Sequence, residues 1–213
     1  MLMYELERKY SNKFGNISIG SLVDSRVELG EDERREIEVL ELGWGSLLSQ
    51  EDRFRVLLEI PGIDVELDSV LDVGCGYGDL SRYLNSGLYR GIDVRLSAIE
   101  RACCKYEGLD FVVSDIYGED IDVRYDWVFG SGIFCFDGLF WEFEVLGILF
   151  EMFKRCRRGV GVNFLSDLSD GVRDKDMRYC RPEDISRLVS LVTKKFVLRH
   201  DYRKNDMTVY LLK

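Results

Sequence analysis

The feature that most constrains this chain is a glycine-rich loop that directly follows a short apolar segment. Residues 70–73 (VLDV) are bounded by turn residues and have the composition of a buried strand. Three glycines then occur within residues 74–78 (GCGYG). Glycines at this spacing let the backbone turn tightly and let a ligand approach it closely. We expect a strand, a loop at which a ligand binds, and a helix through Leu80 and Leu84.

The spacing of these glycines bears on which ligand the loop can take. A dinucleotide fingerprint, G-x-G-x-x-G, would place its third glycine at position 79. Position 79 is Asp79, and the third glycine comes one residue early, at Gly78. An acidic side chain at the start of a helix also opposes a pyrophosphate. We therefore disfavour a nicotinamide-dependent oxidoreductase.

Strand-like and helix-like segments alternate along the rest of the chain. The further strands are expected at residues 89–94, 111–113, 125–129 and 159–165, with a closing hairpin from residues 196–200 and 207–212. The helices between them are expected at residues 96–106, along the stripe of Leu139, Phe143, Leu146, Phe150 and Phe153, and from Pro182 onward. This order predicts an α/β fold with a doubly wound, seven-stranded, mostly parallel, Rossmann-like sheet and an antiparallel C-terminal strand.

The first sixty residues have a different, charged and helical pattern. A helix is expected over residues 31–42, with Ile37, Val39 and Leu40 as its apolar stripe, and another from Ser49 to the residue before Pro61. A turn containing Trp44 separates the two. We expect residues 1–62 to form an N-terminal helical extension or cap and residues 63–213 to form the α/β domain.

Acidic residues follow two consecutive strands of the predicted sheet. Asp93 ends the second strand, and Asp115 with Ile116 follows the third. In a doubly wound sheet, ligands bind at the carboxyl ends of the central strands. A carboxylate after the second strand can accept hydrogen bonds from both hydroxyls of a ribose, while Asp115 accepts from the amino group of an adenine and Ile116 packs on the ring. Acids at loop starts are also common helix caps.

Composition excludes several classes of protein. The 213 residues are 46% hydrophobic, with 29 basic and 39 acidic residues and a net charge of −10. Such a negative chain repels phosphate backbones, so we expect no nucleic-acid partner. No apolar run is long enough for a membrane helix, and the N-terminus has no signal-peptide core. We expect a soluble, cytoplasmic protein without a membrane partner, either a monomer or a homodimer.

The six cysteines do not have the spacing of a metal site or a disulfide framework. No C-x-x-C occurs, and His200 is the single histidine. We expect no structural metal, and most of the thiols to be buried as small apolar groups in a reducing compartment.

Four motifs together resemble those of a known family. Residues 70–78 resemble the first motif of class I S-adenosylmethionine-dependent methyltransferases, and residues 91–93, 114–116 and 125–128 resemble the next three in order. The resemblance covers about residues 66 to 165. More locally, residues 43–54, 163–166 and 198–202 are similar to a small bacterial-type subgroup often found among genes of polysaccharide modification. Arg95 and Leu96 depart from the usual Ser-Pro helix start, so Ser97 with Glu100 can form a later capping box and Arg95 can pair with Asp93.

The resemblance implies S-adenosylmethionine as the cofactor and assigns contacts to it. The contacts that it implies within the α/β domain are Asp72, Gly74, Gly76, Gly78, Asp93, Asp115, Ile116 and Ser131. Before that domain, Gln50 and Arg53 could reach the cofactor's carboxylate, and Trp44 could cover its sulfonium. The alternatives stay open at this point: Trp44 as a packing residue, and Arg53 paired with a helix acid such as Glu51 or Glu59.

The acceptor and the catalytic base are less constrained. His200 and Asp137 are the candidate bases; their alternatives are a structural histidine at a sheet edge and a helix cap. Residues 130–134 (GSGIF) lack the Asn-Pro-Pro-Tyr pattern of enzymes that methylate bases or glutamine. The polar segment 167–181 lies where acceptors commonly bind. We expect methyl transfer to a polar small molecule, such as a sugar or related metabolite; the alternative is a non-catalytic cofactor-binding protein or partner subunit.

Overall fold

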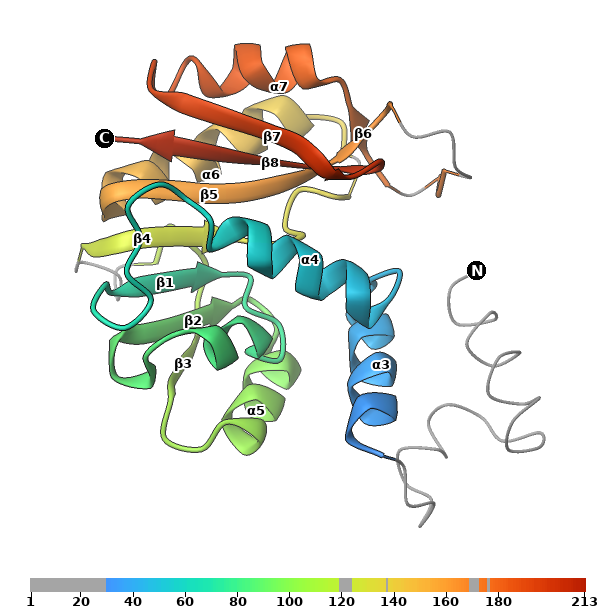
Figure 1. Ribbon diagram of the computed structural model, residues 1–213, viewed down its shortest axis with the longest axis vertical. Helices are drawn as coiled ribbons and strands as arrows, with labels where there is room; N and C mark the ends of the chain where they lie inside the picture. Colours follow the sequence, from blue (N-terminus) through green and yellow to red (C-terminus); the bar gives the residue numbers. More distant parts are fainter. Residues whose placement is uncertain (1–29, 119–123, 137, 169–172, 176) are drawn as a thin grey trace. The chain divides into compact units, whose positions relative to one another are not determined.

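The computed structural model describes residues 30–118, 124–136, 138–168, 173–175 and 177–213 (Figure 1). Its contacts divide the chain between Asp52 and Arg53 into two compact units, each described by itself. The helices and strands are α3 (Glu31–Glu41), α4 (Leu47–Leu57), β1 (Val70–Val73), η1 (Asp79–Tyr83), η2 (Ser86–Leu88), β2 (Tyr89–Asp93), α5 (Leu96–Lys105), β3 (Asp110–Val113), β4 (Tyr125–Gly130), α6 (Trp141–Arg155), β5 (Cys156–Ser166), β6 (Tyr179–Cys180), α7 (Pro182–Val189), β7 (Phe196–Arg203) and β8 (Asp206–Leu212).

The second unit is built on one sheet with the strand order β3-β2-β1-β4-β5-β8-β7. The two-residue strand β6 adds to β5 outside this order, as an eighth strand. Strands β1 to β5 are parallel, whereas β8 is antiparallel to both β5 and β7. The predicted Rossmann-like fold, with its mostly parallel sheet and antiparallel C-terminal strand, is confirmed, including the closing hairpin.

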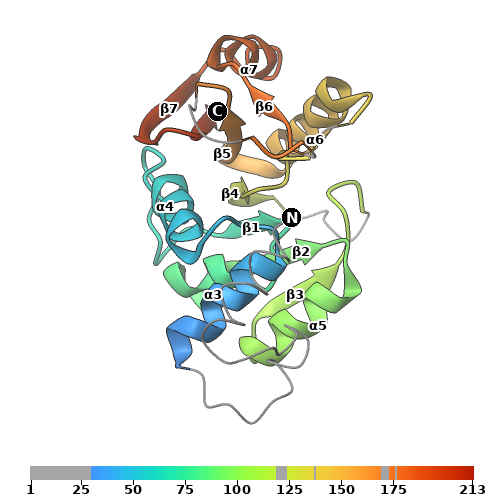
Figure 2. The ribbon, with the colours of Figure 1, turned by 90° about the vertical axis from the view of Figure 1, so that its right-hand side faces the viewer.

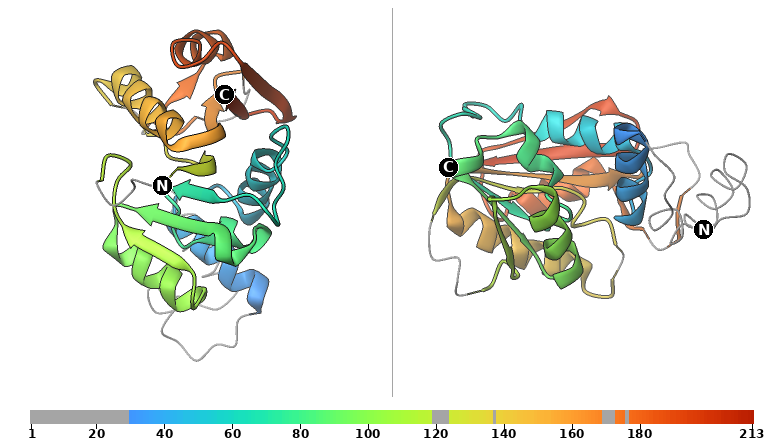
Figure 3. Two further views of the ribbon diagram at one scale, coloured as in Figure 1. Left: turned by 90° about the vertical axis from the view of Figure 1, so that its left-hand side faces the viewer. Right: turned by 90° about the horizontal axis from the view of Figure 1, so that it is seen from below.

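The strand order places a topological switch point between β1 and β4. From β1 the chain moves outward through β2 and β3, then returns to the other side of β1 as β4. At such a point the loops after β1 and β4 diverge and leave room for a ligand at the carboxyl edge. Figure 2 faces this edge, and the left view of Figure 3 faces the opposite edge, where the chain ends after β8.

The core consists of one apolar cluster on each face of the sheet. Leu71 and Val128 pack with α6 and α7, whereas Val70, Trp127 and Phe129 pack with α5 and the C-terminal half of α4. Successive strand residues alternate between the two clusters because side chains alternate across a strand. Helices therefore cover both faces, as a doubly wound sheet requires.

Only part of the apolar stripe predicted for α6 packs against the core, namely Leu146 and Phe153, which are partly buried. The residues that the helix buries are Trp141, Val145, Leu149 and Met152. Of the predicted stripe, Leu139 precedes the helix and Phe143 lies on it, and both are largely exposed, at 91% and 78%. The helix is apolar over most of its circumference, so spacing alone did not show that Leu139, Phe143 and Phe150 are exposed.

Two other helical predictions need correction. The segment through Leu80 is a five-residue 3₁₀ helix, η1, that begins after Gly78 in the left-handed region, and not an α-helix through Leu84. Helix α5 begins at Leu96 with Arg95 as its N-cap. Ser97 is therefore already inside the helix, and the predicted capping box of Ser97 with Glu100 does not form.

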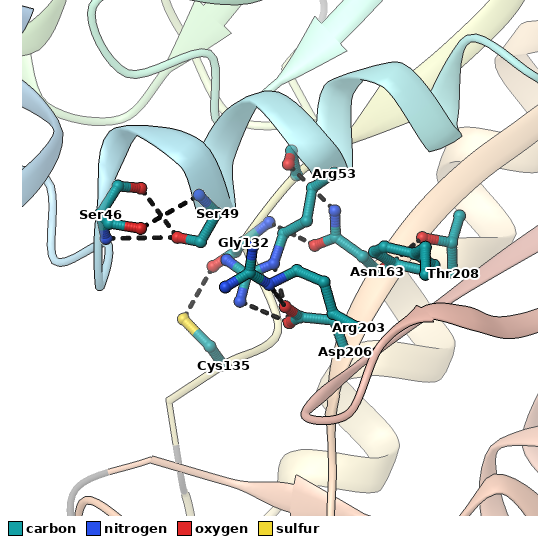
Figure 4. Close-up of polar contacts among 11 residues, drawn as sticks. Ser46, Ser49, Arg53, Gly132, Cys135, Asn163, Arg203, Asp206 and Thr208 are labelled. Atoms are coloured by element: carbon teal, nitrogen blue, oxygen red, sulfur yellow. Dashed lines mark hydrogen bonds and ion pairs between the residues drawn. The ribbon is translucent and has the colours of Figure 1, made fainter. Parts of the chain in front are cut away.

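Both predicted N-terminal helices are present, but α4 begins two residues before the predicted Ser49 and ends at Leu57, earlier than predicted. Ile37, Val39 and Leu40 are the buried residues of α3. Helix α4 begins after Ser46, and Ser46 and Ser49 exchange hydrogen bonds: each backbone N–H donates to the other's hydroxyl, at 3.3 and 3.1 Å (Figure 4). This reciprocal cap ends the turn that contains Trp44. Whether residues up to 62 serve as a cap remains a prediction.

All six cysteines are free thiols, but only half are buried. Cys75, Cys156 and Cys180 are buried, Cys135 is half-buried, and the adjacent Cys103 and Cys104 are exposed on α5. Burial as small apolar groups thus holds for three of them. Among the described residues, no helix combines the length and apolar character needed to cross a bilayer.

Candidate functional site

The glycine loop after β1 is held in a conformation that favours glycine. Gly74, Gly76 and Gly78 have φ angles of 69°, 56° and 82°, a region that residues with a side chain rarely adopt. The backbone N–H groups of Gly74 and Cys75 donate to the carbonyl of Ile92 at 2.8 and 2.9 Å. These bonds tie the loop to the end of β2.

The loop also lies very close to its neighbours. A Cβ atom added to Gly78 would lie 2.5 Å from the ring of Phe111, and one added to Gly74 would lie 2.4 Å from the side chain of Ile133. Both distances are shorter than carbon atoms tolerate. The sequence therefore needs glycine here for space as well as for backbone angle.

Asp93 links the loop to the end of β2. It is buried, with 5% of its surface exposed. One carboxylate oxygen accepts from the N–H of Gly76 at 3.0 Å, and the other accepts from the N–H of Arg95 at 2.9 Å. The guanidinium of Arg95 forms an ion pair with the same carboxylate at 3.3 Å. The predicted local pairing of Arg95 with Asp93 is thus confirmed.

Two further acids lie under and beside the loop. Asp72 is buried and accepts a hydrogen bond from the hydroxyl of Tyr89 at 2.8 Å. Burial, and secondarily the nearby charges of Asp93 and Asp79, raises the pKa of Asp72 to about 7. Asp79 accepts from Lys105 at 2.7 Å and from the hydroxyl of Tyr106 at 2.8 Å. No local pattern predicted these partners, because they come from β2 and from the end of α5.

The two residues predicted to bind adenine, Asp115 and Ile116, differ in exposure. Asp115 is exposed, and its side chain accepts from the N–H of Tyr117 at 2.8 Å. Ile116 is 3% exposed and belongs to the core cluster on the α6 face. Asp115 is thus accessible to a ligand, whereas Ile116 already packs inside the domain, and its expected contact with an adenine ring remains a prediction.

The loop after β4 is held by a buried amide on β5. Asn163 is 3% exposed; its Nδ2 donates to the hydroxyl of Ser131 at 3.0 Å, and its Oδ1 accepts from the N–H of Gly132 at 2.8 Å (Figure 4). The thiol of Cys135 donates to the carbonyl of Gly132 at 2.9 Å. Asn163 was not among the predicted site residues; a polar residue inside the apolar run 159–165 was the signal for it.

Arg53 forms an ion pair with an acid that its own helix does not contain. Its Nε donates to Asp206 at 2.8 Å, and its Nη2 contacts the same oxygen. Arg203 lies 3.5 Å from the other oxygen (Figure 4). The alternative partners on or near the helix are otherwise engaged, because Glu51 pairs with Arg35 and Glu59 pairs with Arg55 and Arg199. That alternative was wrong.

The other predicted site residues are Trp44, Gln50, His200 and Asp137. Trp44 is half-buried and Gln50 is buried, but both belong to the first unit, so their predicted contacts with the cofactor remain predictions. His200 is half-buried on the outer strand β7; its Nε2 is buried and, within the described residues, has no hydrogen-bond partner. Asp137 lies outside the described residues.

A cavity of about 180 Å³ opens beside the end of β5. Its walls come from the start of α6, from the segment around β6 and from α7, and it is lined by Trp141, Glu142, Asp167, Arg178, Tyr179, Cys180, Arg181, Asp184, Ile185 and Leu188. Arg181 pairs with Asp167 at 3.3 Å, and the guanidinium of Arg178 lies 5.2 Å from the Trp141 ring centre. Five of the lining residues belong to the polar segment 167–181, where the sequence predicts that the acceptor binds.

The chemistry of this edge follows from its donors and acceptors. The glycine loop, Asp72 and Asp93 are brought together by hydrogen bonds and contacts, whereas Ser131 belongs to a second group with Asn163. Carboxylates at Asp93 and Asp115 can accept hydrogen bonds from hydroxyl and amino groups. The cavity beyond β5 offers both guanidinium donors and carboxylate acceptors. The edge therefore suits two polar molecules, one at the loop and one in the cavity.

Comparisons with known proteins point in one direction. No model of a protein family matches the chain. A Mycobacterium tuberculosis protein, provisionally named a methyltransferase, is 30% identical over 160 residues, which cover 68% of this chain and 93% of that protein. Identity at this level over nearly the whole relative shows common family membership.

Solved structures agree on the fold. Magnesium protoporphyrin IX methyltransferase from Synechocystis, with bound S-adenosylmethionine, matches with a TM-score of 0.58 and 12% identity, covering 100% of this chain and 97% of that chain. An S-adenosylmethionine-dependent methyltransferase from Clostridium acetobutylicum matches with a TM-score of 0.59 and 12% identity, covering 82% and 95%. At such identities the likeness is one of fold.

Proposed function

The chain belongs to the class I S-adenosylmethionine-dependent methyltransferases, and we propose that it methylates a polar small molecule, such as a sugar or a related metabolite. The cavity beside β5 carries this proposal. It is small, about 180 Å³, and five of its lining residues are charged: Glu142, Asp167, Arg178, Arg181 and Asp184. A polar acceptor can exchange its hydrogen bonds to water for bonds to these groups.

The residues at the carboxyl edge fit the cofactor. We propose that the glycine loop lies against its methionine part, that Asp93 holds the ribose hydroxyls and that Asp115 accepts from the adenine amino group. Ser131 would border the path of the methyl group. The close approach at Gly74 and Gly78 supports this assignment, because a backbone without side chains can touch a ligand directly.

Arg53 has a proposed role beyond its ion pair. Arg53 and Arg203 bring two positive charges to the one carboxylate of Asp206. We propose that these guanidinium groups also bind the carboxylate of the cofactor, because arginine forms charge-assisted pairs with carboxylates. We also propose contacts from Trp44 and Gln50, but these rest on the resemblance of residues 43–54 alone.

When bound, the cofactor supplies a methyl group that its sulfonium has already activated for displacement. The protein then has to align the acceptor behind that group and exclude water, an effect worth roughly 7–11 kcal/mol when the geometry is good. Asn163 contributes to alignment by holding Ser131 and Gly132 in place. The charged walls of the cavity would orient the acceptor's reacting oxygen or nitrogen.

A base is needed only when the acceptor must lose its proton during transfer. His200 and Asp137 are the two bases that the sequence suggests. His200 does not line the cavity, and its Nε2 is buried, so we favour a structural role for it. Asp137 stays a candidate base.

Calorimetric titration tests the proposal. We expect S-adenosylmethionine and its demethylated product to bind, and NADH not to bind. Asp93→Ala should weaken the binding of S-adenosylmethionine and of its demethylated product at least tenfold, because a hydrogen bond to a charged group contributes about 1.5–3 kcal/mol. Glu107→Ala, an exposed acid in the turn after α5, is the matched control. Failure of both sulfur ligands to bind would contradict the proposal.

Turnover separates an enzyme from a binding protein with the same cleft. The protein is incubated with S-adenosylmethionine and fractions of a metabolite extract, and the demethylated product is measured. We expect product with polar, low-molecular-mass fractions. Tight binding of both sulfur ligands without turnover in any fraction would favour the alternative, a non-catalytic binding protein or partner subunit.

A further inference from the structure

An unexpected group of apolar side chains is exposed near the cavity. Phe136, Leu139, Phe140, Phe143 and Leu168 each expose between 59% and 91% of their surface. We call these five residues the apolar collar. Isolated exposed apolar residues are common, but several large ones gathered in one region mark a site of interaction.

The collar residues are neighbours of residues that line the cavity. Leu139 and Phe140 directly precede Trp141, and Phe143 follows Glu142. Leu168 follows Asp167, and Phe136 forms a β-bridge with Met177, the residue before Arg178. The collar thus comes from two parts of the chain, one leading into α6 and one after β5, and each is adjacent in sequence to residues that line the cavity.

The apolar surface continues from the collar along α6. Phe143 and Phe150 lie seven residues apart, two helical turns, and so share a face; Phe150 is 46% exposed. Between them, a Cβ atom on Gly147 would lie 2.8 Å from the hydroxyl of Tyr117, so the exposed Tyr117 packs beside this face. From Phe143 to Phe150 this apolar face is about 10 Å long at 1.5 Å per residue.

The volume of the cavity connects it with the apolar surface outside it. Pockets that enclose a drug-sized ligand measure about 300–1,000 Å³, whereas this cavity measures about 180 Å³. It can hold only one part of a larger acceptor. The rest must lie outside, over a surface that is apolar, while the cavity wall itself is charged.

We propose that the methyl acceptor is an amphiphile whose hydroxyl-rich head enters the cavity and whose alkyl or aryl chain lies along α6 from the apolar collar to Phe150. This inference rests on the proposed function and narrows its substrate class. The transfer remains balanced: the acceptor oxygen forms a bond to the methyl carbon, the sulfur–methyl bond breaks, and the proton of the hydroxyl leaves to a base or to water.

The negative charge of the protein favours a single amphiphilic molecule as the acceptor over an anionic membrane surface. Glu142 and Glu144 stand in the first turn of α6, and the chain carries a net charge of −10. These acids repel an anionic bilayer surface but do not repel a single molecule with a neutral, hydroxylated head.

Binding of two glucosides tests the inference without any methyl transfer. Calorimetry compares octyl β-glucoside, below its micelle concentration, with methyl β-glucoside. We expect the octyl compound to bind at least tenfold more tightly, and Phe143→Ser to remove most of that difference. Leu191→Ser, an equally apolar residue that is 59% exposed after α7, is the control and should change nothing. Equal binding of the two glucosides, or none of the octyl compound, would overturn the inference.

Two further measurements separate the remaining explanations. With cofactor labelled in its methyl group and a whole-cell extract, we expect label in the organic phase, and much less with Phe143→Ser; label in the aqueous phase alone overturns the inference. A dimer that Phe143→Ser dissociates, seen by light scattering, would also overturn it, because a second copy would cover the collar. Binding of the demethylated cofactor is measured in parallel, since its loss would contradict the proposed function itself.

Discussion

Arg53 and Asp206 form a buried ion pair between residues that lie 153 positions apart in the chain. Arg53 reaches the acid with Nε and Nη2 from α4, and Asp206 begins β8 with no exposed surface. The pair therefore joins the C-terminal half of α4, which belongs to the second unit, to the hairpin of β7 and β8. Arg203 also contacts this carboxylate.

Removing the charge of Asp206 should be costly. Asp206→Asn removes the buried negative charge that Arg53 and Arg203 contact, and we expect a loss of about 3–5 kcal/mol in the free energy of unfolding. Urea denaturation measures it. The control is Glu59→Gln, which loses exposed pairs with Arg55 and Arg199, and it should cost below about 1 kcal/mol. Equal losses in the free energy of unfolding for both variants would show that the buried pair contributes no more to stability than an exposed one.

Asp72 should make stability depend on pH. Its pKa is raised from 3.8 to about 7, so the folded state binds the proton more tightly than the unfolded chain does. Stability from this group is present at low pH and is lost as pH rises from about 4 to about 7, with a slope up to about 1.4 kcal/mol per pH unit.

Asp72→Asn removes this dependence while an amide oxygen can still accept from Tyr89. Relative to the wild type, the variant should gain about 2–3 kcal/mol of stability between pH 5 and pH 8. Denaturant titrations at these two pH values give the difference. If the free energies of unfolding of the variant and the wild type differ by the same amount at both pH values, the pKa of Asp72 is not raised.

Replacement by alanine should destabilise the protein more at Gly78 than at Gly108, which has nearly the same backbone angle. Gly78 and Gly108 have φ angles of 82° and 84°, so backbone strain is equal in the two. A Cβ at Gly78 would meet Phe111 at 2.5 Å, whereas nothing lies within 4 Å of one at Gly108. We expect Gly108→Ala to cost about 1 kcal/mol, and Gly78→Ala about 1–3 kcal/mol more, with a matching loss of cofactor affinity at Gly78 alone.

His200 should prove structural. We expect His200→Gln to keep the initial rate of demethylated-product formation within about threefold of the wild type across pH 6 to 9, because the ring lies on the outer strand away from the cavity lining. A general base contributes about 10²–10⁴-fold. A loss of that size, with cofactor binding intact, would restore His200 as the base.

Several site residues were predictable because their signals are local. The glycine loop and Asp93 stand at fixed positions relative to short strands, and Arg95 is two residues from the acid with which it pairs. Asn163 was missed although it interrupts an apolar strand, because a polar residue in a strand does not say what it will contact. Lys105 and Tyr89, the partners of Asp79 and Asp72, gave no local signal at all.

Helix α6 shows where periodicity fails. Its sequence contains two apolar stripes, one through Phe143 and Phe150 and one through Val145 and Leu149. Spacing favours neither, since both have a helical period. Packing against the sheet and α7 decided that the second stripe is buried, and the first was thereby left exposed beside the cavity.

The sequence by itself determined the order of strands and helices, the loop at the carboxyl end of β1 and the resemblance to a cofactor class. Those features depend on residues a few positions apart, so local composition and spacing are enough to recognise them. The tertiary structure alone decided which face of α6 is exposed, which acid pairs with Arg53 and which side chains line the cavity beside β5. Each of these depends on contacts between distant segments, whose distances are set only when the whole sheet has assembled.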